Sequence, residues 1–302
     1  MILDLNKLLH SLYMKECFKQ IKPLLDKIPY RYVIIKGEPL SVQSYGKLGE
    51  RYSCDVDILV SRSNLQLFEK LLENSGFYPL GKSRNSRITQ LCVSHQTLPW
   101  SKPTSLWDNV VIDLNFDLFW GEYEGERIDI GEFLSDTIEM DIYGVKVKTL
   151  PPLKSMVQLI LHHYKDMNSI YLLATRKSIK YDMFKDVYHL WKNNKKDISL
   201  EKLYSISSEY QIIPFVFYIL YYTNQIFNDS ELEKYVNAFK TPEGEALLNC
   251  YGLCDKERKE WKYDFQTRLE SDNLYDLIKD DLTEKDIEKI RINKRIFMGV
   301  SE

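Results

Sequence analysis

Residues 32–60 read YVIIKGEPLSVQSYGKLGERYSCDVDILV, and this stretch decides how the rest of the chain is interpreted. Its two apolar runs, 32–35 and 56–60, predict two short strands joined by a glycine turn and a short helix. Asp55 and Asp57 open the second strand. Because successive side chains of a strand point to opposite faces, these two carboxylates share one face. Two carboxylates beside a glycine turn suggest a divalent-metal site.

The composition is that of a soluble globular protein, with 302 residues, 44% hydrophobic and 28% charged. A net charge of −3 gives no basic footprint for extensive binding of nucleic acid. The five cysteines are odd in number and irregularly spaced, as expected in a reducing cytosol. No signal peptide opens the chain, and no apolar run reaches the ~18 residues that span a bilayer. We therefore expect a cytoplasmic protein that does not enter a membrane.

The first half of the chain mixes helical and strand patterns. Besides the two strands above, helices are expected at residues 3–26, 39–45 and 63–74, and strands at 88–96, 109–119, 137–142 and 145–149. A loop with two prolines is expected between the strands 88–96 and 109–119. In the first helix the predicted apolar stripe consists of Leu5, Leu8, Leu9, Leu12 and Tyr13.

The second half of the chain has a helical pattern only. The sequence Leu150-Pro151-Pro152 marks the change, and no further strand is expected after it. Helices are predicted from residue 153 onward and at 181–191, 199–209, 212–227, 230–239, 243–252 and 283–297. The expected domains are therefore an α/β domain over residues 1–150 and a helical domain over 151–302.

A third carboxylate lies on the strand expected at 109–119. Alternation places Asp113 and Asn115 on one face of this strand and apolar side chains on the other, core-facing side. Asp113 would then converge with Asp55 and Asp57 if the strands are neighbours. Converging carboxylates raise one another's pKa unless a cation lies between them. Mg²⁺ or Mn²⁺ relieves this conflict, and the same ions serve nucleotidyl transfer.

Positive charge and backbone donors for a triphosphate lie nearby. Gly37 lets backbone N–H groups approach phosphates closely, and Lys36 and Arg51 add charge. For these charged residues, purely structural roles remain open as alternatives. The aspartates could cap turns or pair with a lysine, Lys36 could form a surface ion pair, and Arg51 could bridge to Asp55 or to a neighbouring glutamate.

These residues carry a resemblance to a known family. The pattern consists of Lys36-Gly37-x-x-Leu40, Tyr45, Arg51, Asp55-x-Asp57-Ile58-x-Val60 and Ile112-Asp113-Leu114-Asn115-Phe116. It resembles the nucleotidyltransferase superfamily that includes DNA polymerase β, and more closely a bacterial branch described as uncharacterised nucleotidyltransferases. The resemblance covers residues 30 to 195. It implies an α/β (α+β) fold, with a mixed-sheet nucleotidyltransferase domain followed by a helical domain that closes the cleft.

The resemblance also implies an activity and its site. A nucleoside monophosphate would pass from an NTP, such as ATP, to a hydroxyl of an acceptor. Asp55, Asp57 and Asp113 would be catalytic and would hold Mg²⁺ or Mn²⁺. Lys36, Gly37 and Arg51 would bind the nucleotide. A small-molecule acceptor is the expected partner, and a protein or tRNA acceptor is the alternative. The oligomeric state is left open.

Two positions depart from the family pattern. Glu38 follows Gly37 where active members of the superfamily have Gly-Ser, so a carboxylate beside a triphosphate would have to face away. Asn115 stands where histidine is usual. These departures keep a second hypothesis open, a nucleotide- or partner-binding module of the same fold that has lost catalysis.

Overall fold

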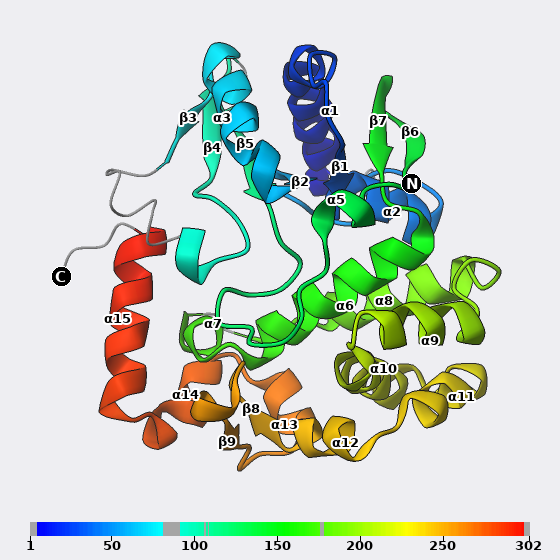
Figure 1. Cartoon of the computed structure of the whole chain (residues 1–302), viewed down its shortest axis with the longest axis vertical. Coiled ribbons are helices and arrows are strands. Elements are labelled where there is room, and N and C mark those ends of the chain that lie inside the picture. The colour runs from blue at the N-terminus through cyan, green and yellow to red at the C-terminus, as the bar shows by residue number, and fades with distance from the viewer. Residues whose placement is uncertain (1–4, 81–90, 106, 108, 176–177, 299–302) are drawn as a thin grey trace. The chain divides into compact units, whose positions relative to one another are not determined.

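A computed structural model describes residues 5–80, 91–105, 107, 109–175 and 178–298 (Figure 1). The chain divides into two compact units, one of residues 1–118 and 128–155, the other of residues 119–127 and 156–302. Whether they serve as a transferase domain and a cleft-closing domain stays a prediction. Among the helices in these described ranges, none has both the length and the apolar character needed to cross a membrane.

The first unit is built on a seven-stranded mixed sheet with the strand order β3-β4-β5-β2-β1-β7-β6 (Figure 1). Its elements in chain order are α1 (Leu5–Leu25), β1 (Tyr32–Ile35), α2 (Gly37–Tyr45), β2 (Val56–Val60), the 3₁₀ turn η1 (Arg62–Asn64), α3 (Leu65–Asn74), β3 (Tyr78–Pro79), β4 (Trp100–Pro103), β5 (Asn109–Asn115), α5 (Ile130–Phe133), β6 (Ile138–Ile142) and β7 (Val145–Thr149). Strand β2 runs antiparallel to β1 and parallel to β5. The predicted mixed sheet is confirmed.

The second unit is mainly helical. Helix α6 (Pro152–Asn168) passes into it from the first unit. The elements that follow are α7 (Ile170–Thr175), α8 (Tyr181–Asn193), α9 (Leu200–Glu209), α10 (Ile213–Phe227), α11 (Ser230–Phe239), α12 (Pro242–Leu248), β8 (Cys250–Tyr251), η2 (Asp255–Glu257), β9 (Lys259–Glu260), α13 (Phe265–Glu270), α14 (Leu274–Ile278), η3 (Lys279–Asp281) and α15 (Glu284–Met298). The expectation of no strand here is wrong, because β8 and β9 form a short antiparallel pair.

The main core of the first unit lies on one face of its sheet. Helices α1 and α3 bury their apolar faces against the strand residues Ile34, Ile58 and Ile112, which lie on this face. The neighbouring residues along each strand, among them Asp57 and Asp113, point to the opposite face by the alternation of a strand. The predicted division of β5 into a core-facing side and a carboxylate side is thus confirmed.

Three local expectations for this unit are wrong. Residues 91–93 are helical, and of the strand expected at 88–96 only an isolated bridge at Gln96 is seen; residues 88–90 lie outside the described ranges. The expected proline loop contains β4 instead, whose Pro103 ends the strand and so removes no hydrogen bond from its middle. The leucines expected on the buried stripe of α1 are exposed, and the buried face lies further along, from Met14 to Leu25.

Glu38 ties α2 to two other segments of the first unit. Its side chain is buried, and its two carboxylate oxygens accept hydrogen bonds from the Gly49 backbone N–H, at 2.8 Å, and from the Tyr143 hydroxyl, at 2.9 Å. Tyr143 and Gly144 form the β6–β7 turn, both with positive φ, as a two-residue hairpin turn of type I′ requires. Glu38 therefore fixes the loop that leads from α2 into β2.

We expect Glu38→Ala to lower the free energy of unfolding by about 2–3 kcal/mol, because it leaves a buried N–H and a hydroxyl without their charged acceptor. Urea denaturation measures this change. Glu139→Ala, on an exposed position of β6, is the matched control and should alter stability by less than about 0.5 kcal/mol. Equal stability of the two variants would contradict the structural role given to Glu38.

Candidate functional site

The register of three neighbouring strands places two of the predicted carboxylates side by side. Asp57 of β2 is paired with Asp113 of the parallel strand β5 and, on its other side, with Ile35 at the end of β1. Partners in register on adjacent strands point to the same face of a sheet. The side chains of Asp57 and Asp113 therefore lie next to each other.

Asp57 forms a buried ion pair with Lys36. The Lys36 Nζ lies 2.7 Å from Asp57 Oδ1, and the two side chains are only 8% and 7% exposed. Asn115 Nδ2 donates to the same oxygen at 3.2 Å and to the Asp113 backbone carbonyl at 3.1 Å. One Asp57 oxygen thus already has two donors. Asn115, which replaces the usual histidine, holds the two aspartates in position.

Asp113 is the least compensated of the three carboxylates. Gln96 Nε2 donates to Asp113 Oδ2 at 3.3 Å, whereas the buried Asp113 Oδ1 has no hydrogen-bond partner among the described residues. Burial, followed by the charges of Asp57 and Asp55, raises the pKa of Asp113 to about 7, while Lys36 and Gln96 act in the opposite direction. A buried, repelled carboxylate of this kind favours a proton or a cation.

Asp55 lies just before β2 and is held by its own loop. Ser53 Oγ donates to Asp55 Oδ1 at 3.0 Å, and the backbone N–H of Ser53 donates to His10 Nε2 of α1, also at 3.0 Å. Burial and then the charge of Asp57 raise the pKa of Asp55, while Lys36, Ser53 and Arg51 lower it. Arg51 thus acts on Asp55 through its charge from the loop before β2.

The junction between β1 and α2 has an unusual backbone. Lys36 has φ 56° and ψ −144°, and Gly37 has φ 41°. For a residue with a side chain, such a conformation costs about 1–3 kcal/mol, and it occurs where the surrounding structure enforces it. A Cβ on Gly37 would lie 3.7 Å from Ser53 Oγ, so the positive φ, rather than lack of space, requires glycine here. The turn leads into the N-terminus of α2, whose N–H groups favour anions.

The carboxylates fit a hard divalent cation in their chemistry. Asp55, Asp57 and Asp113 provide only oxygen ligands, and the orphaned Asp113 oxygen and the raised pKa values call for added positive charge. Within the described ranges, however, the group whose ligand atoms all lie within 4.8 Å of one another is a different one, on α6. Closer convergence of the aspartates requires a rearrangement around Asp57, where Lys36 now supplies the cation.

Two residues of this site could not be assigned from the sequence. The strand predicted over residues 88–96 gave no reason to place the Gln96 side chain next to Asp113. Ser53 gave no signal beyond its place in a loop before the aspartates. Glu38 could be noted as a departure, but only its contacts with Gly49 and Tyr143 show that it faces away from the turn.

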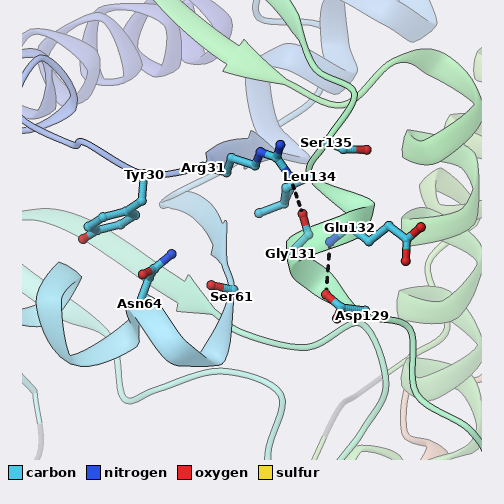
Figure 2. A pocket seen from close by; sticks show the side chains of 9 residues that line it. All are labelled: Tyr30, Arg31, Ser61, Asn64, Asp129, Gly131, Glu132, Leu134 and Ser135. Carbon is cyan, nitrogen blue, oxygen red and sulfur yellow. Dashed lines mark hydrogen bonds between the residues drawn. The ribbon is translucent and has the colours of Figure 1, made fainter.

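A hollow of about 720 Å³ lies elsewhere on the first unit (Figure 2). Its lining comes from Tyr30, Arg31, Ser61, Asn64, Asp129, Gly131, Glu132, Leu134 and Ser135. Arg31 precedes β1 and Ser61 follows β2, so the hollow lies at the end of these antiparallel strands opposite to Lys36 and Asp57. Figure 2 shows Arg31 donating to the Gly131 carbonyl, at 3.1 Å. The hollow includes none of the predicted site residues.

The chain is similar to known nucleotidyltransferases in both sequence and fold. The mixed sheet and the sequence match together define a nucleotidyltransferase-like protein. The chain belongs to the family described as "Uncharacterised nucleotidyltransferase", whose model matches residues 7–228. The resemblance found in the sequence is thereby confirmed. Comparison with curated protein sequences gives no match.

Two solved structures show similarity in fold. One is an antigenic nucleotidyltransferase-like protein from Paracoccidioides brasiliensis, with 15% identity, a TM-score of 0.43, and coverage of 76% of this chain and 94% of the other. The other is the antibiotic-resistance factor ANT(2'')-Ia, with 13% identity, a TM-score of 0.39, and coverage of 67% and 92%. Similarity at this level identifies no substrate for this chain.

We expect the metal-free protein to lose stability as the pH rises from 5 to 8. The folded pKa of Asp113, about 7, exceeds its ordinary value of 3.8, so at pH 5 the folded state retains a proton that the unfolded chain has already released, and it loses this proton as the pH rises to 8. This fall in the free energy of unfolding is on the order of 2–4 kcal/mol, and Asp113→Asn should abolish it. Urea denaturation at both pH values, with a chelator present, measures it.

The matched control is Asp136→Asn, at an exposed position of the same unit, which should keep the pH dependence of the unchanged protein. If Asp113→Asn shows that same dependence too, the raised pKa is assigned to the wrong residue.

Proposed function

We propose that this protein transfers a nucleoside monophosphate from an NTP to a hydroxyl of an acceptor molecule, with release of pyrophosphate. The observation that carries the proposal is the in-register pair Asp57 and Asp113 beside the Lys36 ammonium and the N-terminus of α2. Membership of a nucleotidyltransferase family supports the same reaction class. Carboxylates next to anion-binding groups are what this reaction needs.

Asp55, Asp57 and Asp113 would hold Mg²⁺ or Mn²⁺, which would supply positive charge to offset the negative charge that develops on the phosphates. The support is the chemistry of the three side chains, all oxygen donors in a partly buried setting where their charges oppose one another. Asn115 and Ser53 orient these carboxylates by hydrogen bonds to Asp57 and Asp55. Such orienting partners tune the geometry of a site as much as the ligands do.

Lys36, Gly37 and Arg51 would bind the triphosphate. Lys36 has to leave Asp57 before this carboxylate can take up a cation, and its ammonium then becomes available to phosphate oxygens. Gly37 opens α2, so the backbone N–H groups of the first turn can approach an anion without a side chain between them. Arg51 adds positive charge from the loop before β2. Glu38 does not oppose this, because Gly49 and Tyr143 hold it away.

Asp113 would accept the proton of the acceptor hydroxyl. The oxygen of this hydroxyl forms a bond to the α-phosphorus, the bond from the α-phosphorus to the bridging oxygen breaks, and pyrophosphate leaves. General-base catalysis needs a carboxylate within hydrogen-bond reach of the proton that it accepts. In the present structure Asp113 Oδ1 has no hydrogen-bond donor among the residues described.

The acceptor is proposed to be a small molecule, and the nucleotide an NTP such as ATP, in the cytoplasm. The net charge of −3 argues mildly against tRNA, whose phosphates call for a basic surface. A protein or tRNA acceptor is the alternative. Incubating the protein with labelled NTPs and cell extract distinguishes them, because the label then appears in small molecules, in protein or in RNA.

We expect Asp57→Ala to reduce Mg²⁺-dependent pyrophosphate release by at least about a hundredfold, since it removes a ligand of the metal ion that would offset charge in the transition state. The assay couples pyrophosphate release from each NTP to a colour reaction, with extract as the source of acceptor. Asp136→Asn is the control and should release pyrophosphate at the unchanged rate.

Two outcomes would count against transfer by this site. Unchanged release by Asp57→Ala would exclude the aspartates as the catalytic group. Mg²⁺-dependent NTP binding by the unaltered protein, without turnover over any extract, would favour the binding module that has lost catalysis.

We further expect Lys36→Met to bind Mg²⁺ about tenfold or more tightly without nucleotide, because a unit positive charge beside the carboxylates is removed from a site of low dielectric. The same variant should bind NTP more weakly. Isothermal titration calorimetry with each ligand measures both changes. Lys19→Met, on an exposed position of α1, is the control. Weaker Mg²⁺ binding by Lys36→Met would contradict the opposition between Lys36 and a metal at Asp57.

A further inference from the structure

A second group of ligand-type side chains lies on α6 of the helical unit. The group consists of His162, His163 and Asp166, and one ligand atom of each lies within 4.8 Å of the others. Positions separated by three and four residues lie on the same side of a helix, which brings Asp166 toward both histidines. His162 Nε2 lies 3.4 Å from Asp166 Oδ2, and the two imidazole rings are 5.5 Å apart.

The spacing of these atoms is close to that of a metal site. In a tetrahedral zinc site with bonds of ~2.0–2.1 Å, two ligand atoms lie about 3.3 Å apart. The pair His162 and Asp166 already has this separation. His163 would have to approach by a small change in ring orientation, since its ligand atom is within 4.8 Å of the other two.

The three residues differ in their exposure to solvent. His163 and Asp166 are buried, whereas the His162 side chain is 18% exposed and offers a route of entry. A buried carboxylate requires a positively charged neighbour, and the Lys165 Nζ lies 3.4 Å from Asp166 Oδ1. The cluster therefore combines two imidazoles, one carboxylate and a neighbouring ammonium.

We propose that His162, His163 and Asp166 bind a divalent transition-metal ion of the Zn²⁺ class. Two imidazole nitrogens and one carboxylate oxygen suit Zn²⁺ and its neighbours in the transition series, and three protein ligands leave a fourth position for water or a ligand. The three aspartates of the first unit offer oxygen atoms only, which suit Mg²⁺. The two sites share no ligand and differ in the metal they favour.

Lys165 gives the proposal a sharp test. Its ammonium lies beside Asp166 and opposes a second cation at the same carboxylate. If the cluster is a metal site, Lys165→Met raises the affinity for the metal. If His162 and Asp166 form only an ion pair, the protein does not bind the metal either before or after this substitution.

The experiment uses the full chain, from which metal has been removed with a chelator. The protein is titrated with Co²⁺ in the presence of excess Mg²⁺, so that Mg²⁺ fills the proposed site at the three aspartates of the first unit. We expect one equivalent of Co²⁺ to bind with the strong visible absorption bands of four- or five-coordinate Co²⁺, and Zn²⁺ to displace it. His162→Ala and Asp166→Asn should each weaken binding by at least about tenfold, since loss of even an outer-shell partner costs that much. Lys165→Met should tighten it.

His189→Ala, on α8, is the matched control and should keep the affinity and the absorption bands of the unchanged protein. Because His162 is the most exposed member, His162→Ala should fold, and thermal unfolding checks this in each variant. Zn²⁺ should raise the melting temperature of the unchanged protein but not of His162→Ala. Absence of Co²⁺ binding, or equal binding by the unchanged protein and His162→Ala, would overturn the proposal.

Discussion

The candidate site depends on a buried ion pair between Lys36 and Asp57. Removing both charges from water is unfavourable unless they meet at close range, and 2.7 Å between Nζ and Oδ1 satisfies this condition. The pair joins the end of β1 to the start of β2, so it exists only if Ile35 and Asp57 are in register. It also requires the positive φ of Lys36, whose strain the surrounding structure has to offset.

Because side chains alternate along each strand, one face of the sheet packs into the core and the opposite face carries the candidate site. Ile58, Ile112 and Leu114 face the core with α1 and α3, while Asp57 and Asp113 share the other face. A shift of β5 by one residue would bury Asp113 among apolar side chains, and the resulting cost specifies the register. Glu38 adds a second constraint, because it anchors the loop that brings Arg51 and Asp55 to the start of β2.

Much of this arrangement follows from sequence pattern. The strands of 32–35 and 56–60 and the face of Asp113 could be predicted, because apolar runs, glycine turns and alternation are local signals. The mixed sheet was predicted from the resemblance to the nucleotidyltransferases. The rest depends on long-range contacts. Nothing local shows that Lys36 would pair with Asp57, that Gln96 would reach Asp113, or that Glu38 would point to Tyr143. Strand β4, with its poor strand composition, forms because β5 offers it an edge.

We propose that the carboxylates beside Lys36 form the metal site of a nucleotidyltransferase. A crystal structure with Mg²⁺ and a non-hydrolysable NTP tests it most directly. We expect Mg²⁺ within about 2.0–2.1 Å of oxygens of Asp57 and Asp113, with Lys36 Nζ moved from Asp57 to a phosphate oxygen. Lys36 still paired with Asp57, with the nucleotide and metal bound elsewhere, would contradict it.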